Sequence, residues 1–452
     1  MNGKLSLLFL LTFAVAGCTA QVMETRIVKD GLFIPWELLY GPDGHIWFTQ
    51  KNGYICRLAL QTGETDTLYH EPEVAIRGEG GMLGMAMHPA FPDSPYLYVA
   101  YDYLKAGVYT EKIVRYTYNG QGLQSPFVLL DDIAAASYHN GCRLLIVGGK
   151  LFITTGDAGT GSRAQDLQSR NGKVLRINLD GTVPADNPLP GNPVWAWGLR
   201  NSQGLTYAND RLYGSEHGPD SDDECNILLK GRNYGWPAVT GYCNTPAEQA
   251  FCNDSNVVEP LRAWTPTLAV SRIAWYGTGA MFPALQRCML MTTLKDEKLY
   301  RLQLNVAGDS ILSAEAVAGV SFGRLRAVCV APDGRIFLST SNSPADGSGP
   351  FTDRIIELYD PQSIGIGALP AQRRLTVYPN PAAGRSIRLA DDMLPAGGTY
   401  TITDIQGRVL RSANLPAQGV ISVDGLAAGS YFLQGRDRHG RIMTGRFVRM
   451  QE

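Results

Sequence analysis

Two short motifs rich in polar residues carry the most chemical information in this sequence. Gly198–Gly204 reads GLRNSQG, and Glu216–Glu224 reads EHGPDSDDE. The four carboxylates within residues 220–224 repel one another unless a cation joins them, and oxygen ligands suit a hard ion such as calcium. The corner at Gly218–Pro219 can aim consecutive backbone carbonyls at one point, because proline fixes φ and glycine accepts unusual angles. A solvated acidic loop is the alternative interpretation.

A histidine and an aspartate lie at the two ends of another strand-like segment. The segment begins at His139–Leu144, which reads HNGCRL, and ends at Asp157; the whole chain has six histidines. A histidine at a strand entrance can act as a general base, and a nearby carboxylate can orient it and keep it basic. We therefore consider His139 a candidate base oriented by Asp157, with a hydrogen-bonded core histidine as the alternative.

Two arginines are spaced for one side of a strand. Arg324 and Arg326 precede the apolar run Ala327–Ala331. Residues two apart in a strand face the same way, so both guanidinium groups are expected to enter one space and bind a polyanion. Lys295, after another apolar run, is expected to add a third cation. Two surface arginines on an outer strand are the alternative.

Composition narrows the class of protein. The chain has 452 residues, of which 50 are glycine, 26 proline and 18% charged, and its net charge is −2. This composition is typical of many short strands joined by tight turns, and the charge gives no reason to expect a nucleic-acid partner.

Residues 1–20 have the pattern of a signal peptide. Two endings are open: a lipobox at Val15–Cys18, which would leave a lipidated Cys18, or ordinary cleavage before Gln21. Either ending predicts export, and a disulfide between Cys243 and Cys252 is then possible in an oxidising compartment. No later apolar run is long enough to cross a bilayer.

A recurring unit predicts the fold. A turn with glycine or Pro-Asp-Gly, followed by an alternating strand, occurs six times at intervals of roughly 45 to 80 residues, as radial β repetition requires. We predict an all-β protein with a six-bladed β-propeller over residues 25–360; a large β-sandwich is the alternative. The copies are Gly41–Phe48, Pro92–Val99, Gly148–Ile153, Asn209–Tyr213, Gln286–Leu290 and Pro332–Leu338.

The C-terminal part differs in character. Residues 361–373 form a linker rich in glycine, alanine and proline, and residues 374–452 have the strand–turn rhythm of a small β-sandwich. This segment resembles the C-terminal sorting domain of type IX secretion cargo in Bacteroidetes, through YPNP at Tyr378–Pro381, the D-x-x-G-R hairpin at Asp404–Arg408 and G-x-Y at Gly429–Tyr431. The resemblance implies an address read by the secretion machinery.

Several motifs in one order resemble the soluble PQQ-dependent glucose and aldose sugar dehydrogenases. The resemblance implies a six-bladed propeller that oxidises C1 of an aldose to a lactone, with calcium-bound PQQ as cofactor and an external electron acceptor. The motifs are Gly78–Pro89, His139–Leu144, Gly198–Gly204, Glu216–Asn226, Lys230–Pro237 and Arg324–Gly334.

The resemblance also implies roles for single residues. His139, Asp157 and Arg200 would be catalytic, with His139 as the base. PQQ would be held by Glu79, Arg200, Asn201, Lys295, Arg324 and Arg326. The carbonyls of Gly218 and Pro219 would hold its calcium, a second calcium site would include Asp223, Glu224 and Tyr234, and Tyr138 and Trp264 would line the sugar pocket.

Three departures from the family pattern bear on specificity. Glu79 stands where the family usually has glutamine, Tyr138 where the glucose enzyme has an acidic residue, and Tyr242–Trp264 is short, which favours a monomer. Two other functions are alternatives to a dehydrogenase: a non-catalytic propeller that binds carbohydrate or protein, and a calcium-dependent lactonase. Binding alone would not require His139, and a lactonase has no use for Arg324 and Arg326.

Overall fold

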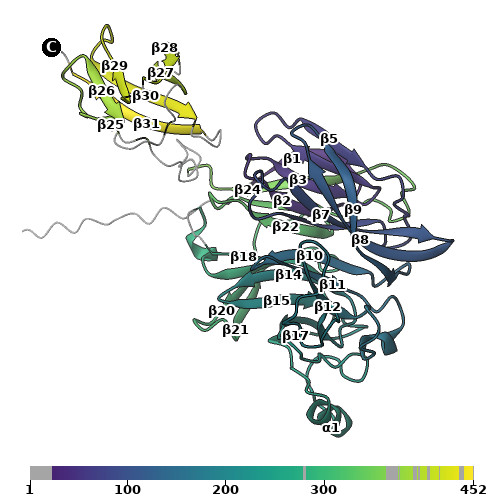
Figure 1. Cartoon of the computed structure of the whole chain (residues 1–452). Coiled ribbons are helices and arrows are strands. Elements are labelled where there is room, and N and C mark those ends of the chain that lie inside the picture. Colours follow the sequence, from purple (N-terminus) through teal and green to yellow (C-terminus); the bar gives the residue numbers. More distant parts are fainter. Residues whose placement is uncertain are drawn as a thin grey trace, which may run out of the picture. The chain divides into compact units, whose positions relative to one another are not determined.

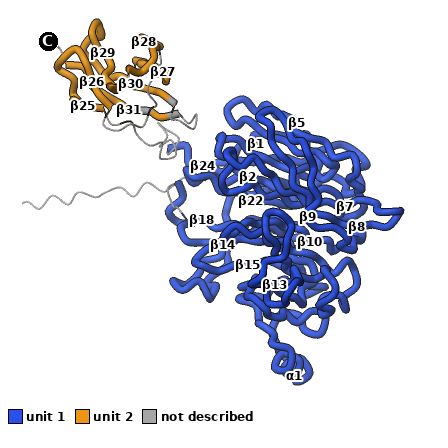
Figure 2. The backbone as a smooth tube through the Cα atoms, viewed as in Figure 1, with its two compact units in different colours: residues 1–365 blue, residues 366–452 orange. Residues whose placement is uncertain are grey.

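A computed structural model describes residues 23–277 and 281–362, and in the C-terminal part 375, 377–389, 394, 398–404, 408–416, 418–436 and 442–450. The expected signal peptide at 1–20, with Cys18, lies outside these residues, as does most of the expected linker. The chain divides into two compact units, Met1–Gly365 and Ile366–Glu452 (Figure 2).

In the residues that the structure describes, unit 1 forms six four-stranded antiparallel sheets, so the predicted all-β fold with six blades is confirmed (Figure 1). The first strands of successive sheets contact one another in a closed ring that ends with β22 against β2. The sheets are β2–β5 (Pro35–Tyr40, Ile46–Gln50, Tyr54–Leu58, Thr65–His70), β6–β9 (Met82–Met87, Tyr96–Lys105, Val108–Tyr118, Leu123–Ala134), β10–β13 (Gly141–Val147, Lys150–Thr155, Lys173–Asn178, Val194–Trp197), β14–β17 (Ser202–Ala208, Arg211–Glu216, Asp223–Ile227, Arg262–Trp264), β18–β21 (Val270–Tyr276, Cys288–Thr293, Leu299–Leu304, Ile311–Ala316) and β22–β24 (Leu325–Val330, Ile336–Thr340, Asp353–Tyr359) with β1 (Glu24–Leu32).

The ring is closed by the N-terminal strand. β1 pairs antiparallel with β24, so the last sheet takes one strand from the start of unit 1 and three from its end. Because this pairing joins residues more than 320 positions apart, no local pattern in the sequence indicated it.

The turns that predicted the repeat all lie between the first and second strands of a blade. In β2–β3, for example, the turn at Gly41–Gly44 is closed by hydrogen bonds from Gly41 N to His45 O and from Gly44 N to Gly41 O. The second strand of each blade is almost fully buried. The repeat in the sequence is therefore one turn plus one core strand per blade.

The first strand of every blade is irregular near its start. The strand-pairing register shifts between Pro35 and Glu37 in β2 and between Met82 and Met85 in β6, and β10, β14, β18 and β22 shift in the same way. A bulge of this kind takes a residue out of the ladder and re-aims its side chain, often beside a functional site. Trp36, Gln203 and Arg326 occupy such positions.

Unit 2 has two small sheets with one shared core, which agrees with the predicted β-sandwich. Tyr400, Leu433 and Phe447 are among the buried residues of that core. One sheet is β25–β26–β29 (Val377–Tyr378, Ser386–Leu389, Val420–Ser422), and the other is β28–β27–β30–β31 (Val409–Asn414, Thr399–Asp404, Gly429–Arg436, Ile442–Arg449).

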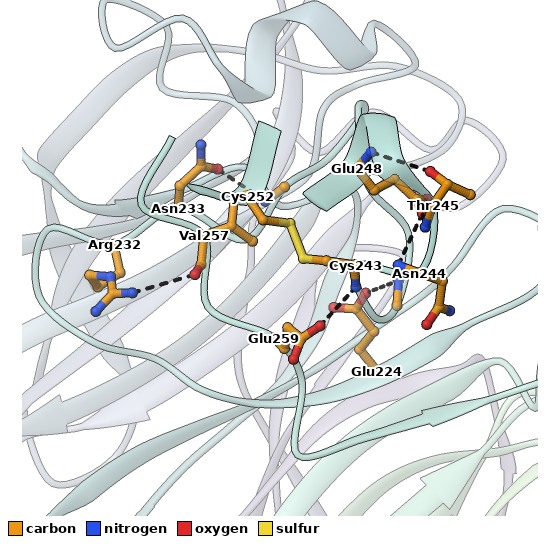
Figure 3. Close-up of a disulfide and its surroundings, with 12 residues drawn as sticks. Glu224, Arg232, Asn233, Cys243, Asn244, Thr245, Glu248, Cys252, Val257 and Glu259 are labelled. Atoms are coloured by element: carbon orange, nitrogen blue, oxygen red, sulfur yellow. Dashed lines mark hydrogen bonds between the residues drawn. A yellow bond between two sulfur atoms is a disulfide. The ribbon is translucent and has the colours of Figure 1, made fainter. Parts of the chain in front are cut away.

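The described part of unit 1 also contains helical segments: two 3₁₀ turns, Gly161–Ala164 and Pro283–Leu285, and the α-helix α1, Pro246–Asp254. α1 begins with a capping box, in which Thr245 and Glu248 bond reciprocally. Cys243 and Cys252 form the disulfide considered above, which fastens this excursion between β16 and β17 (Figure 3).

Candidate functional site

A cavity of about 400 Å³ lies where the first strands of the blades begin and the second strands end. Such a volume is typical of a pocket for a small molecule or cofactor. Its wall combines the bulged residues with segments that flank the strands: Trp36, Lys51, Gly78, Glu79, Gln203, His217, Arg324, Arg326 and Ser341–Ser343, together with Ile34, Ala269, Leu294 and Ala345.

Positive charge concentrates on one side of this cavity. Arg324 and Arg326 both line it, as the spacing of two predicted, although β22 is bulged between Leu325 and Ala327 instead of alternating regularly. Arg326 is 8% exposed, and burial lowers its pKa to about 10. Lys51 is buried beside them with its ammonium on the carbonyls of Gly78 and Ala345, and burial lowers its pKa to about 8.

His139 and Asp157 are in direct contact. His139 Nδ1 lies 2.8 Å from Asp157 Oδ1, which also accepts from Gly159 N at 2.7 Å, and Trp236 Nε1 donates to Asp157 Oδ2 at 2.9 Å. Because Asp157 accepts in these contacts, His139 Nδ1 carries a proton toward it, and in the neutral imidazole this tautomer places the lone pair on Nε2. The pair has the geometry of a carboxylate-oriented general base.

A glycine allows the two loops of this pair to approach. A Cβ at Gly156 would lie 1.9 Å from the carbonyl oxygen of His139, so no other residue fits there. His139 itself has φ of 59°, in the left-handed region that non-glycine residues seldom adopt. The backbone of the base is therefore held in an unfavourable conformation by its surroundings.

Glu79 links the cavity to this base. Its Oε2 accepts from His139 N at 3.1 Å and from Asn201 Nδ2 at 3.4 Å. Glu79 is open to solvent along the cavity, and protein surrounds it on its other sides. Burial raises its pKa, but His217, the His139 N–H and Arg326 outweigh burial and hold the pKa below the usual value.

Arg200 occupies a second, much smaller space. Its guanidinium stacks 5.3 Å from the Trp236 ring, and its NH1 donates to the carbonyl of His217 at 3.3 Å. The backbone N–H of Arg200 donates to Glu216, and its carbonyl accepts from Asp157 N at 2.8 Å. Arg200 thus connects the loop of Asp157 to the strand end at Glu216.

Arg200, Glu216, Glu224 and Tyr234 line this second cavity of about 10 Å³, the size of a single water molecule. Glu216 and Glu224 are register partners across β15 and β16. Burial and the neighbouring Glu224 raise the pKa of Glu216 well above its ordinary value, and burial raises the pKa of Glu224 to about 7.

Asp223 is fully engaged with the backbone around the Gly218–Pro219 corner. Its Oδ1 accepts from Gly218 N at 2.9 Å, and its Oδ2 accepts from Leu268 N at 2.7 Å and Val270 N at 3.3 Å. Asp223 is therefore the group that fixes the corner to the start of β18.

Glu224 and Tyr234 also have protein partners. Glu224 accepts from Asn226 Nδ2 at 2.9 Å and from Gly241 N at 2.7 Å. The Tyr234 hydroxyl donates to Ile227 O at 2.6 Å and accepts from Leu229 N. In the described residues no group of three or more His, Cys, Asp or Glu side chains is arranged to hold a metal ion.

The remaining predicted site residues lie at the edge of this arrangement or outside it. Tyr138 is 47% exposed and packs edge-on against His139, with ring centroids 4.7 Å apart. Lys295 is exposed with its ammonium on Thr267 Oγ1, and Trp264 is a partly buried residue of β17 packed against an apolar core cluster. Neither Lys295 nor Trp264 is among the residues that line the two cavities.

Lys51, Gln203 and His217 are among the cavity residues that the sequence did not identify. His217 lies inside the motif Glu216–Glu224 and Gln203 inside Gly198–Gly204, and that position was the available signal. Lys51 has no comparable signal, because it follows β3 in an ordinary turn.

Elsewhere in the described chain, no helix is long and apolar enough to cross a membrane.

Known proteins match both units. Residues 32–348 match the glucose/sorbosone dehydrogenase family, and residues 376–448 match the secretion system C-terminal sorting domain. Quinoprotein glucose dehydrogenase B of Acinetobacter calcoaceticus is 36% identical over 263 residues, which are 50% of this chain and 55% of that enzyme. Aldose sugar dehydrogenase YliI of Escherichia coli is 28% identical over 75% of this chain and 95% of its own length.

A solved structure agrees with these matches. The PQQ-bound aldose sugar dehydrogenase of Streptomyces coelicolor has a TM-score of 0.64 and 32% identity, over 75% of this chain and 98% of that one. The chain therefore belongs to the glucose/sorbosone dehydrogenase family and carries a secretion system C-terminal sorting domain.

Proposed function

We propose that this protein is an exported quinoprotein that oxidises the C1 hydroxyl of aldose sugars to lactones, with PQQ and calcium as cofactors. The single observation that carries the proposal is the cavity of about 400 Å³ whose basic wall of Arg324, Arg326 and Lys51 is linked through Glu79 to the His139–Asp157 pair.

The donors around the cavities fit PQQ, which has three carboxylates and an orthoquinone. Arg326 Nε, Arg200 Nε and His217 Nε2 are buried, and none has a hydrogen-bond partner among the described residues. Buried guanidinium groups pair best with carboxylates, and an anion supplies the acceptor that Arg326 Nε and Arg200 Nε lack. Arg324, Arg326, Arg200 and Asn201 would hold the cofactor, with Glu79 beside it. We keep Lys295 as a candidate contact that requires its side chain to turn toward the cavity.

The chemistry of the protein side follows from the His139–Asp157 pair. His139 Nε2 takes the proton of the sugar C1 hydroxyl, while Asp157 holds Nδ1–H and stabilises the resulting imidazolium. Trp236 and Gly159 keep Asp157 in place, and Arg200 supplies positive charge on the same side. When bound, PQQ would supply the two-electron acceptor for the sugar, and an external acceptor would then reoxidise it.

Calcium would act at the Gly218–Pro219 corner. Both backbone carbonyls are candidate ligands, and oxygen ligands suit the ion. Asp223 holds this corner in place, because its Oδ1 accepts a hydrogen bond from Gly218 N. A second calcium would use Glu224, with Asp223 and Tyr234 as further candidates, since Glu216 and Glu224 are buried register partners at the second cavity, where Arg200 is the cation that acts on Glu216.

The sugar would rest against Tyr138, whose exposed ring packs on the base, and Trp264 is the second candidate wall. An aromatic face suits the C–H face of a pyranose.

We propose that the protein is a monomer and that it is exported by type IX secretion through the C-terminal unit. The alternative location is the periplasm, with the protein free or lipid-anchored at Cys18.

Reconstitution tests the proposal. Purified protein freed of metal and cofactor is titrated with PQQ in the presence of calcium, and bound quinone is followed by absorbance. We expect saturable binding and dye reduction that depends on aldose, PQQ and calcium together. Arg324→Ala and Arg326→Ala are each expected to weaken PQQ binding by about 1.5–3 kcal/mol, as for a hydrogen bond to a charged group. Absence of PQQ binding in the wild type would refute the function.

A further inference from the structure

One chain of side-chain hydrogen bonds connects the basic wall of the cavity to the backbone of the candidate base. Arg326 NH1 donates to Gln203 Oε1 at 2.9 Å, and Gln203 Nε2 donates to Asn201 Oδ1 at 2.9 Å. Asn201 Nδ2 donates to Glu79 Oε2 at 3.4 Å, and the same oxygen accepts from His139 N at 3.1 Å. The three side-chain donors point one way, from Arg326 toward the Glu79 carboxylate, and the His139 N–H donates to that carboxylate from the other side.

Gln203 is the residue that fixes this direction. Its amide oxygen must face Arg326, because an arginine only donates, and its amide nitrogen must then face Asn201. This arrangement forces Asn201 to present its own NH₂ to Glu79, which accepts only. Gln203 is 4% exposed and Asn201 is fully buried, so water cannot readily substitute for a missing link.

The bulge in β14 explains why Gln203 is available. The register shifts between Ser202 and Gly204, which leaves Gln203 outside the ladder with its side chain at the cavity wall. Its carbonyl accepts from Arg143 Nε at 2.9 Å, and Arg143 is fully buried, so the backbone there is fixed as well.

We propose that Gln203 is a positioning residue, which couples occupancy of the basic wall at Arg326 to the placement of His139 through Asn201 and Glu79. An anion that binds Arg326 changes the hydrogen bond from Arg326 to Gln203, which is the first in the chain. The last hydrogen bond, from His139 N to Glu79, holds the left-handed backbone of His139. Cofactor binding and base placement are therefore thermodynamically linked. This inference rests on the proposed function, because it takes PQQ as the anion.

A double-mutant cycle tests the coupling. Gln203→Met removes both links with little change in volume, and Glu79→Met removes the acceptor at the far end of the chain. Each variant and the double variant are compared with the wild type in PQQ affinity, measured by titration, and in kcat and KM with saturating PQQ. Gln303→Met is the matched control, because Gln303 also makes two side-chain hydrogen bonds but lies in β20, away from the cavity.

We expect Gln203→Met to lower kcat by about 5- to 150-fold, the range of ordinary coupling energies, with a smaller change in KM. We expect the kcat of the double variant to be no lower than that of the worse single variant. Each substitution interrupts the same chain of hydrogen bonds, so the second one adds no further loss. Gln303→Met is expected to behave like the wild type. Independent, multiplicative losses of kcat from Gln203→Met and Glu79→Met would overturn the proposal.

A second readout does not depend on turnover. With ¹⁵N-histidine labelling the chain gives at most six backbone resonances, and His139 is assigned by its loss in His139→Ala. PQQ without sugar is expected to shift the His139 amide in the wild type, and the shift is expected to be reduced at least twofold in Gln203→Met at saturating PQQ. An unchanged shift in Gln203→Met would overturn the coupling, whereas failure of PQQ to bind the wild type would instead refute the proposed function.

Discussion

At the scale of residues, the carboxylates of this protein differ in their hydrogen-bond partners. These partners indicate which carboxylates hold other groups in place and which are candidates to bind a metal ion. Asp157 accepts from a base, a tryptophan and a backbone amide, while Asp223 accepts only backbone N–H groups. From the sequence, Asp223 and Glu224 were both predicted as calcium ligands, because a sequence does not show which way each side chain points. Adjacent residues in a strand point to opposite faces, so the two carboxylates serve different surroundings.

This difference predicts different results for two isosteric variants. Asp223→Asn replaces one acceptor by a donor that faces Gly218 N or Leu268 N, so it is expected to destabilise the fold by about 1–3 kcal/mol with or without calcium. Glu224→Gln is expected to change stability mainly when calcium is present, by weakening a bound ion that stabilises the native state. Thermal unfolding with calcium and with chelator measures both. Equal chelator sensitivity in Glu224→Gln and the wild type would contradict a calcium role for Glu224.

At the scale of elements, the sequence predicted the blades well and the site in part. A short turn followed by a buried second strand repeats locally in each blade, and two of these turns contain Asp-Gly, so the blades could be predicted from the sequence. The bulges of the first strands arise from packing around the axis, and they decide that Gln203 and Arg326 face the cavity. Lys51 reaches the site through tertiary placement alone, which is why it was missed, whereas His217 lies inside the Glu216–Glu224 motif. Lys295 was expected beside the two arginines, and its ammonium contacts Thr267 Oγ1.

The pairing of β7 with β8 contains a buried carboxyl pair. Asp102 and Glu111 are register partners with no exposed surface; Asp102 Oδ1 has no hydrogen-bond partner among the described residues, and the Cys142 thiol is the side-chain partner of Glu111. Burial raises the pKa of Asp102, with Gly81 N–H and Lys51 opposing it. Burial and then Asp102 raise the pKa of Glu111. The folded protein therefore keeps protons on this pair at pH values where the unfolded chain has lost them.

The sign of the resulting pH dependence follows from linkage. A carboxyl whose pKa is raised on folding adds stability below the unfolded pKa of about 4, and this stability is lost as pH rises toward the folded pKa. We expect the free energy of unfolding of Glu111→Gln to fall less steeply above about pH 4 than that of the wild type, by up to about 1.4 kcal/mol per pH unit. Urea unfolding between pH 5 and 8 measures the slopes, with exposed Glu315→Gln as control. Parallel slopes for Glu111→Gln and wild type would show that the pair does not titrate as described.

At the scale of the whole molecule, the chain combines a catalytic unit with a sorting unit that has its own core. Because the two cavities are lined by residues of unit 1, removal of residues 366–452 is expected to leave PQQ affinity and the main unfolding transition unchanged. In a host with type IX secretion, the same truncation is expected to retain the protein inside the cell. Export of the truncated chain at the wild-type level would show that the C-terminal unit is not its address.

We propose that His139 acts on the sugar while the basic wall holds the cofactor, and one experiment separates these two roles. PQQ-loaded wild type, His139→Ala and Arg326→Ala are mixed with excess aldose, and the absorbance change of the bound quinone is followed through a single turnover. We predict that His139→Ala binds PQQ as the wild type does but reduces it about 10²- to 10⁴-fold more slowly, as expected for loss of a general base. Arg326→Ala should bind weakly and react at a rate closer to wild type once saturated. Wild-type reduction kinetics in His139→Ala would contradict the account.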